Sequence, residues 1–391
     1  MLVENHYGDR TWNNDVNTIG SLDEIDSIIS SKDKYFVAGG AHIYHMFAKY
    51  KLPIHISFIK DDSECDTFFK REWLDGYVIH ERVEYDEFTY TYMKWDGDSS
   101  EHQYLDIMRR ILDNGSLRST RNGNVLSIFN ANMTFDLRDG FPLITTKKMF
   151  LRGIIEELLF FLRGDTDTTI LSDKNVNIWK GNTTKEFLQD MKLPYAENVM
   201  GPMYGYQWRS FNRPYKITTT GIPTQDRTGD EIDQIKDVVN LIRTDPTSRR
   251  ILLTTYNPIQ AHEGVLYPCH SIIIQFYVDG DFLDMFCYNR SQDLFLGTPY
   301  NIASSSLLLM IIAKICNKIP RKFHLSMGDV HIYESHTNVS KQQIERLPYK
   351  KPNIKINRDI ADVDELCDLV FEDFELSNYN SDSKLFAEMV T

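Results

Sequence analysis

The sequence predicts an α+β fold built on a large twisted sheet, preceded by a smaller and partial α/β domain. Strand-like runs follow one another in the second half of the chain, at residues 250–256, 271–278, 281–288 and around His331. Asp279-Gly280 lies between two of these runs and is a dipeptide typical of a tight hairpin. A mostly apolar stretch at residues 153–166 predicts a helix that carries two glutamates. Strands and helices therefore both contribute to the main domain.

The N-terminal part predicts the smaller α/β domain. Ser21 caps a segment with helical periodicity, which predicts a short helix over residues 21–29. A buried strand at 34–38 runs into Gly39-Gly40, and a helix follows. Further strands are predicted at residues 54–59, 77–83 and 88–95. The glycine pair is either a tight packing turn or a place where backbone N–H groups meet a phosphate.

A short polar stretch at residues 96–100 is the obvious linker, so we predict domains at 1–98 and 99–391. The second domain begins with a predicted helix that ends at Gly115, and strands follow at 125–129 and 132–137. The predicted helix at 153–166 carries Glu156 and Glu157. Burying a lone carboxylate is costly, so at least one of the two needs a partner or a chemical role.

Composition excludes several classes of protein. The 391 residues carry a formal charge of −13, which disfavours binding to nucleic acid or anionic lipid. No run reaches the roughly 20 apolar residues of a membrane span. The five cysteines form no CxxC pair, so we predict neither a disulfide framework nor a metal site. The N-terminus lacks the pattern of a secretory signal, and we expect a cytoplasmic protein.

Cys269 is the candidate nucleophile. Tyr267-Pro268-Cys269-His270 places a thiol beside an imidazole, although a cysteine in such a position is more often a small buried apolar residue. Arg290 follows Cys269, and Arg249 and Arg250 precede it. Guanidinium groups match phosphate oxygens bidentately, so these arginines indicate a phosphorylated small substrate.

Seven motifs, in order, carry a resemblance to thymidylate synthase over nearly all of residues 101–391. They are FPLITTKK, IIEELLFFLRGDT, GPMYGYQWR, DPTSRR, YPCH, NRSQDLFLGTPYNIAS and GDVHIY. Residues 10–95 resemble the C-terminal half of dihydrofolate reductase, on a GGxxIY turn, a DTFF stretch and a closing hairpin. The whole chain thus resembles the fused dihydrofolate reductase and thymidylate synthase type with a truncated reductase part. The resemblance implies the thymidylate synthase fold and a reductase part without activity, so we do not expect NADPH to be used.

The resemblance also implies the chemistry. Cys269 would attack C6 of the uracil ring of dUMP, and the ring would take the methylene carbon of 5,10-methylenetetrahydrofolate, giving dTMP and dihydrofolate. Glu157 would organise the water network for proton transfer, and Tyr204 would act as base or position a water. Asn301 would read uracil, and Arg290 would lower the pKa of the thiol. His270 has little weight as a catalyst.

The remaining site residues also come from the resemblance. For dUMP they are Arg121, Arg290 and Ser291 at the phosphate, Arg249 and Arg250 donated by the second subunit of a homodimer, and His331 and Tyr333 at the ribose. Asp293 would contact the pterin ring beside dUMP, and Trp179 and Lys147 the folate. Arg118 is the less favoured alternative to Arg121.

Two other functions stay open. A pyrimidine hydroxymethylase is disfavoured because the enzymes of that kind that act on dCMP carry an aspartate where this chain has Asn301. An inactive scaffold or RNA-binding regulator is disfavoured by the intact site set and by the acidic charge.

Overall fold

The computed structural model describes residues 2–3, 18–19, 37, 41–61, 69–97, 101–224 and 231–390. The chain divides into two compact units, Met1–Gly97 and Asp98–Thr391. The boundary that the sequence predicts, after residue 98, lies next to this division. The predicted helix at 21–29 and most of the strand and glycine turn at 34–40 lie outside the described residues. Two short strands, β1 (Leu2–Val3) and β2 (Thr18–Ile19), pair in parallel.

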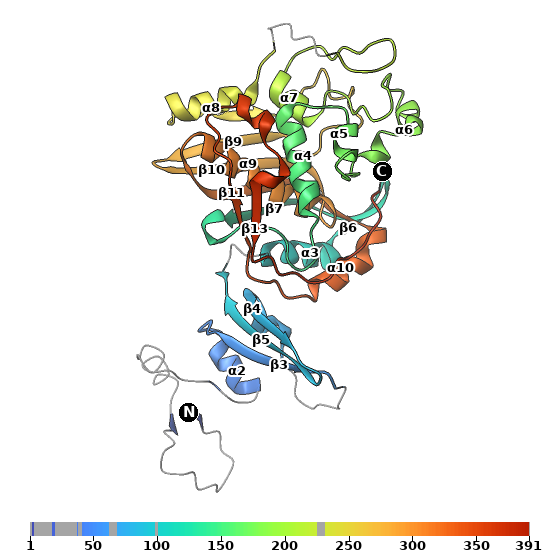
Figure 1. Ribbon diagram of the computed structural model, residues 1–391. Helices are drawn as coiled ribbons and strands as arrows, with labels where there is room; N and C mark the ends of the chain where they lie inside the picture. Colours follow the sequence, from blue (N-terminus) through green and yellow to red (C-terminus); the bar gives the residue numbers. More distant parts are fainter. Residues whose placement is uncertain are drawn as a thin grey trace. The chain divides into compact units, whose positions relative to one another are not determined.

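The N-terminal unit contains a three-stranded antiparallel sheet (Figure 1). Its elements are helix α2 (Ala41–Ala48) and strands β3 (Ile54–Ile59), β4 (Tyr77–Glu84) and β5 (Phe88–Trp95), in the order β3-β5-β4. The three strands confirm the predicted runs. Val78, Ile79 and Met93 are buried in this sheet, which gives the unit apolar contacts of its own.

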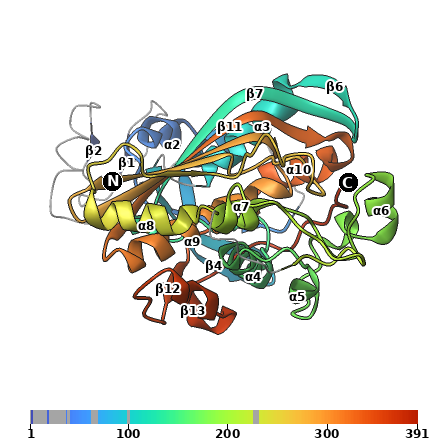
Figure 2. The ribbon, with the colours of Figure 1, turned by 90° about the horizontal axis from the view of Figure 1, so that it is seen from above.

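The C-terminal unit is built on a six-stranded mixed sheet, as predicted (Figure 1). In spatial order its strands are β6 (Ser116–Thr120), β7 (Gly123–Asp136), β11 (Ile319–Tyr333), β10 (Phe282–Asp293), β9 (Ile273–Asp279) and β8 (Leu252–Thr254). Gly280 adopts a positive φ of 60° and closes the predicted hairpin between β9 and β10. Strands β10 and β11 run parallel, and the other neighbours are antiparallel. Figure 2 shows the long strands β7 and β11 side by side.

Two apolar helices form the core against this sheet. Helix α9 (Gly297–Ile315) packs on β10 and β11, and α4 (Leu151–Arg163) packs on α9. The other helices of the unit are α3 (His102–Asn114), α5 (Thr169–Ser172), α6 (Lys185–Asp190), α7 (Tyr204–Ser210), α8 (Gln234–Thr244) and α10 (Thr337–Ile344), and β12 (Asn353–Ile356) pairs with β13 (Phe374–Ser377). A Cβ on Gly205 would lie 2.3 Å from the carbonyl oxygen of Phe161, so glycine is what lets α7 approach α4.

Two further findings concern the described residues alone. None of their helices is long and apolar enough to cross a membrane. They contain no group of three or more histidine, cysteine or acidic side chains arranged to hold a metal ion.

Candidate active site

A cavity of about 520 Å³ opens where β10 passes into α9. Its wall also includes residues from α4, from the segment before β9 and from the C-terminal segment. Most of the predicted site residues line it: Arg121, Glu157, Trp179, Tyr204, Cys269, Arg290, Ser291, Asp293, Asn301, His331 and Tyr333. The fold therefore brings these residues, which lie far apart in the sequence, to one place.

Cys269 is held by the C-terminal end of β10. The backbone N–H of Arg290 donates to the Cys269 carbonyl at 3.0 Å, and the Arg290 Nε donates to the Pro268 carbonyl at 2.7 Å. Burial raises the pKa of the Cys269 thiol above its ordinary value, while the Tyr204 hydroxyl and the Arg290 charge act in the opposite direction. Arg290 therefore acts on the thiol pKa in the predicted direction, but burial is the larger effect and the net pKa is raised.

Tyr204 and His270 flank the thiol. The Tyr204 hydroxyl lies 3.3 Å from Cys269 Sγ, and its ring stacks on His270 with centroids 4.1 Å apart. Burial raises the pKa of Tyr204 well above its ordinary value and lowers that of His270 to about 4. Both rings are therefore neutral at pH 7. Of the two roles predicted for Tyr204, this favours positioning a water over acting as a base.

The adjacent glutamates of α4 have different environments. Glu156 is buried and accepts from Lys174 Nζ at 2.6 Å, with Arg152 at 3.7 Å. Glu157 faces the cavity, where its carboxylate accepts from Trp179 Nε1 at 2.8 Å. Burial raises the pKa of Glu157 to about 7. Glu156 thus has a structural partner, and Glu157 is the carboxyl group available for proton transfer near neutral pH.

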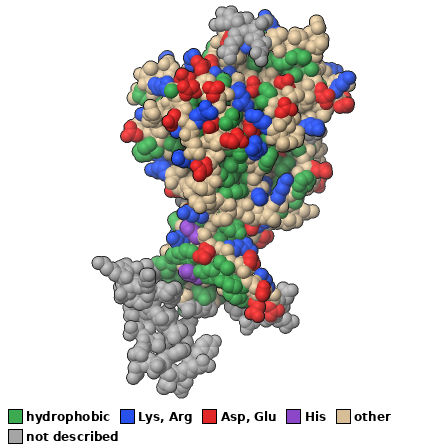
Figure 3. Space-filling model, viewed as in Figure 1, with side chains coloured by type: hydrophobic (Ala, Val, Ile, Leu, Met, Phe, Trp, Pro, Cys, Tyr) green, Lys and Arg blue, Asp and Glu red, His purple; other side chains and the backbone are tan. Residues whose placement is uncertain are grey.

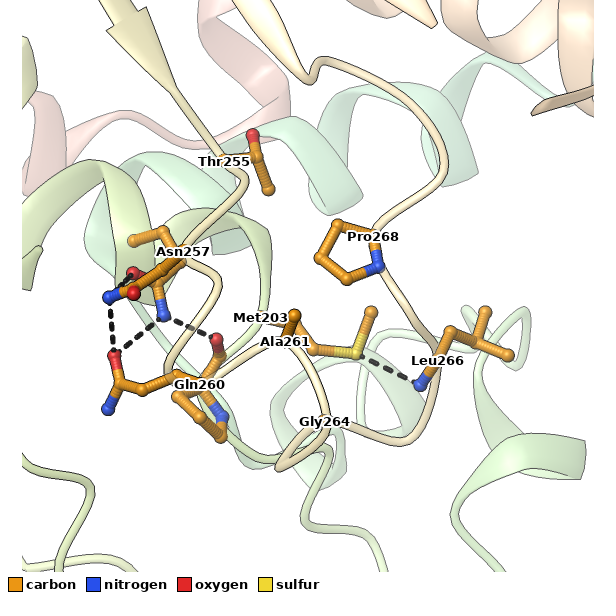
Figure 4. A pocket seen from close by; sticks show the side chains of 10 residues that line it. Met203, Thr255, Asn257, Gln260, Ala261, Gly264, Leu266 and Pro268 are labelled. Atoms are coloured by element: carbon orange, nitrogen blue, oxygen red, sulfur yellow. Dashed lines mark hydrogen bonds between the residues drawn. The ribbon is translucent and has the colours of Figure 1, made fainter. Parts of the chain in front are cut away.

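The loop that leads to Cys269 is fixed by side chains that the sequence did not indicate (Figure 4). Gln260 Oε1 accepts from Gln207 Nε2 at 3.0 Å and from Asn257 Nδ2 at 3.2 Å. The backbone N–H of Leu266 donates to Met203 Sδ at 3.4 Å. These contacts depend on residues from two distant segments, so no local pattern marks them.

A chain of carboxamides on the other side of Cys269 was also not predicted. The backbone N–H of Ser271 donates to Asn289 Oδ1 at 2.7 Å, and Asn289 Nδ2 donates to Gln292 Oε1 at 2.6 Å. Asn301 Nδ2 donates to the same Gln292 oxygen at 3.3 Å. The amide of Asn301 is therefore tied to the backbone beside the thiol.

The end of β11 contributes His331 and Tyr333. His331 Nδ1 lies 3.2 Å from Asp329 Oδ1, and Asp329 Oδ2 accepts from Arg118 at 2.5 Å. Arg118 is thus engaged with Asp329, whereas Arg121 lines the cavity. This arrangement favours Arg121 over Arg118 as the arginine that faces a bound anion.

Comparison with known proteins finds matches for both parts of the chain. A family model described as thymidylate synthase matches residues 102–391, and one described as dihydrofolate reductase matches residues 4–96. The chain is 36% identical over 378 residues to a bifunctional dihydrofolate reductase-thymidylate synthase of Paramecium tetraurelia, covering 92% of this chain and 80% of the relative. It is 42% identical over 311 residues to the thymidylate synthase of Saccharomyces cerevisiae, and the match covers 76% of this chain and 99% of the relative. A bifunctional dihydrofolate reductase-thymidylate synthase of Plasmodium chabaudi is 43% identical over 291 residues, and the match covers 74% of this chain and 48% of the relative.

The chain belongs to the thymidylate synthase family. It is a fused chain in which a dihydrofolate reductase segment precedes a thymidylate synthase domain, and it is an enzyme with methyltransferase activity.

Three predicted site residues do not line the cavity of the synthase domain. Arg249 and Arg250 are exposed just before β8. Lys147 is buried, and its Nζ donates to the Phe295 carbonyl and lies 3.7 Å from the centroid of that ring. Burial lowers the pKa of Lys147 to about 7. Lys147 therefore braces the segment after Asp293 in this structure, and its contact with folate stays a prediction.

Asp293 itself begins that segment. Its Oδ1 accepts from the backbone N–H groups of Phe295 at 2.9 Å and Leu296 at 3.1 Å, one residue before α9 starts. The carboxylate therefore fixes the start of the helix and still lines the cavity.

The C-terminal segment of the synthase domain forms part of the cavity wall, through Lys384, Leu385, Phe386, Ala387, Met389 and Val390. His336 Nε2 lies 2.8 Å from the Glu388 carbonyl. Arg346 donates to the carbonyl oxygens of Ser383 at 2.6 Å and Thr146 at 2.7 Å. The segment is thus anchored at both ends of its cavity-lining part.

Proposed function

We propose that the cavity binds dUMP and 5,10-methylenetetrahydrofolate together, and that Cys269 starts the methylation of dUMP. The observation that carries this proposal is the placement of the Cys269 thiol, the Asn301 amide and the guanidinium groups of Arg121 and Arg290 in one cavity. A nucleophile, a base-reading amide and an anion site are what a pyrimidine nucleotide requires.

The reaction begins when Cys269 Sγ forms a bond to C6 of uracil and the electrons move onto O4 as an enolate. C5 then attacks the methylene carbon of the folate, and the C5 proton leaves. The folate is eliminated and returns a hydride to the new methylene group, which yields a methyl group and dihydrofolate while the bond to Cys269 breaks. Covalent attack replaces one difficult alkylation with several easier steps.

Activation of the thiol depends on the substrate as well as on the protein. Burial favours the neutral thiol, and the Tyr204 hydroxyl and Arg290 favour the thiolate. We propose that the Tyr204 hydroxyl donates to the thiolate as it forms, since Tyr204 stays protonated at neutral pH. Arg290 adds positive charge beside the same sulfur.

Glu157 is proposed as the group that exchanges protons with the base. Its pKa of about 7 leaves it partly protonated at neutral pH, which suits a group that first supplies a proton toward O4 and later takes one back. Trp179 orients the carboxylate by its hydrogen bond. Ser291, His331 and Tyr333 are proposed to hold the phosphate and the ribose, and Asp293 and Trp179 to contact the folate.

The alternative of a hydroxymethylase acting on dCMP requires the opposite pattern of donors and acceptors at the base. Asn301 offers one N–H and one carbonyl oxygen to the cavity after its bond to Gln292. That set matches O4 and N3–H of uracil. The scaffold or RNA-binding alternative has less support, because Figure 3 shows acidic and basic side chains intermixed on the visible face of the C-terminal unit.

We propose that two copies of the chain stack through the outer face of the six-stranded sheet. Apolar side chains of that face are exposed, with Ile273 at 42%, Tyr277 at 65% and Phe286 at 39%. Exposed apolar side chains in one sheet face are typical of a surface covered by a partner. Arg249 and Arg250 lie next to β8 at the edge of this sheet. In the proposed dimer they would reach the cavity of the second copy and contact the phosphate of the dUMP bound there.

We propose that the reductase segment of this chain does not reduce dihydrofolate and does not consume NADPH. The match to the reductase family covers residues 4–96, and the described part of that segment includes the three-stranded sheet β3-β5-β4 and helix α2. Supplying dihydrofolate and NADPH to the full chain tests this, since steady NADPH oxidation would contradict it.

The test of the proposed reaction is tritium release from [5-³H]dUMP in the presence of 5,10-methylenetetrahydrofolate. Release should accompany dihydrofolate formation in equal amounts and should vanish in Cys269→Ala. Cys287→Ala is the matched control, because that thiol is buried outside the cavity wall. Failure of the unaltered chain to release tritium would overturn the proposal.

A further inference from the structure

The chain of carboxamides beside Cys269 has a defined polarity. Asn289 and Gln292 are each only 1% exposed, and the oxygen of each accepts hydrogen bonds from protein groups. Ser271 donates its backbone N–H to Asn289 Oδ1, Asn289 donates to Gln292 Oε1, and Asn301 donates to the same oxygen.

The backbone N–H at the start sets every later orientation. A backbone N–H is only a donor, so the Ser271 end requires the oxygen of Asn289. The nitrogen of Asn289 must then face Gln292, which requires the oxygen of Gln292. That oxygen in turn requires the nitrogen of Asn301. An amide flip at any of the three positions would bring two acceptors or two donors together.

The fixed direction of these hydrogen bonds determines which pyrimidine base can pair with Asn301. With one N–H held by Gln292, Asn301 presents its other N–H and its oxygen in fixed places, which fit O4 and N3–H of uracil. Cytosine presents an N–H₂ donor and an N3 acceptor in the corresponding places. To pair with cytosine, Asn301 would have to flip and point its oxygen at the Gln292 oxygen.

We propose that Gln292 determines pyrimidine specificity, acting as a positioning residue that holds the Asn301 amide in the orientation for uracil. The inference rests on the proposed function in one respect, namely that Asn301 contacts the base. Gln292 acts through Asn301, so its removal changes which base is preferred and not only how tightly nucleotides bind.

Three variants of the full chain test the inference, with equilibrium binding of dUMP and dCMP measured by calorimetry. Gln292→Met keeps the length of the side chain and removes the acceptor. Gln292→Glu keeps an acceptor for both neighbouring amides and is the matched control. Asn289→Ala leaves Gln292 in place and removes the group that orients it.

The preference for dUMP over dCMP, taken as the ratio of the two dissociation constants, should fall about tenfold in Gln292→Met, which corresponds to one hydrogen bond. It should fall similarly in Asn289→Ala and stay within about twofold of the unaltered chain in Gln292→Glu. The thermal unfolding midpoint of each variant shows whether it folds.

An unchanged ratio in a folded Gln292→Met protein would overturn the inference, as would an equal loss in Gln292→Glu. If Gln292→Met does not fold, an unchanged ratio in Asn289→Ala overturns it instead. The binding ratio is independent of turnover. A chain that prefers dUMP but forms no dTMP would therefore contradict the proposed reaction and leave the specificity inference standing.

Discussion

At the scale of single residues, the same chemical group takes different roles because its surroundings differ. Glu156 and Glu157 are neighbours on α4, yet Lys174 and Arg152 neutralise the first, while Trp179 is the only hydrogen-bond donor to the second within the described part of the chain. The pKa of Glu157 rises to about 7 because its charge is poorly compensated. A buried carboxyl group without a cation is the one that titrates in the working range of an enzyme.

Glu157→Gln should therefore change both the rate and its pH dependence. In the unaltered chain, ionisation of Glu157 removes the proton that the base needs, so kcat should decline as pH rises through about 7. In the variant, kcat should no longer decline as pH rises through this range, and it should be lower by about a hundredfold or more. Measurement of kcat from pH 5 to pH 9 checks the expectation, with Glu156→Gln as a control for loss of the neighbouring charge.

The same pKa shift makes a prediction for stability. The folded-state pKa of Glu157 lies above its ordinary value of 4.5, so folding is favoured at low pH and this contribution is lost as pH rises through about 7. Glu157→Gln should be more stable than the unaltered chain at pH 8, by about 1 to 3 kcal/mol, and equally stable near pH 4. Urea unfolding at the two pH values measures the difference. A stability gain of equal size at pH 4 would contradict this account.

At the scale of elements, the apolar patterns predicted the parts that pack locally. The runs at 77–83, 88–95 and 281–288 correspond to β4, β5 and part of β10. The apolar stretch at 153–166 corresponds to α4, which begins at Leu151 and ends at Arg163. The apolar patterns could not predict what holds the loop before Cys269. Gln207 contacts this loop from α7, and Met203 contacts it from the residue just before α7. The surroundings of Lys147 were beyond such reasoning too. The resemblance implied a contact with folate, and only the tertiary fold shows that the Phe295 carbonyl accepts a hydrogen bond from its ammonium group.

The C-terminal segment gives a prediction at this scale. Arg346→Met should free the Ser383 end of the segment and reduce kcat/KM about tenfold, because charge-assisted hydrogen bonds to two carbonyl groups are lost. Steady-state kinetics and the rate of proteolysis within residues 380–390 measure the effect. Arg358→Met, which removes an exposed ion pair to Asp373, is the control and should leave both quantities unchanged. Equal behaviour of the two variants would show that Arg346 does not anchor the segment.

At the scale of the whole molecule, the proposed dimer makes each cavity depend on two chains. The exposed apolar sheet face and the exposed arginines before β8 are separate observations that the same second copy would account for. The sequence alone predicts neither feature. A sheet face that a second copy covers has the same pattern of apolar residues as a strand buried within one chain.

Mixing two inactive proteins tests the shared site. Cys269→Ala lacks the nucleophile, and the double variant Arg249→Ala with Arg250→Ala lacks the donated cations. Subunit exchange should restore roughly a quarter of full activity, because half of the dimers are mixed and each mixed dimer has one complete site. Mixing Cys269→Ala with Cys269→Ser is the control and should restore none. If the first mixture also stays inactive although the subunits exchange, the arginines act within their own chain or not at all.

In the proposed reaction, Cys269 bonds to C6 of the pyrimidine in a complex that also holds the folate. The most direct measurement uses 5-fluoro-dUMP with 5,10-methylenetetrahydrofolate, because fluorine at C5 cannot leave as a proton does and the covalent intermediate accumulates. Mass spectrometry of the digested protein should place one adduct, containing both nucleotide and folate, on the peptide with Cys269, and Cys269→Ala should carry none. An adduct on another residue, or dTMP formation without any adduct, would contradict the account.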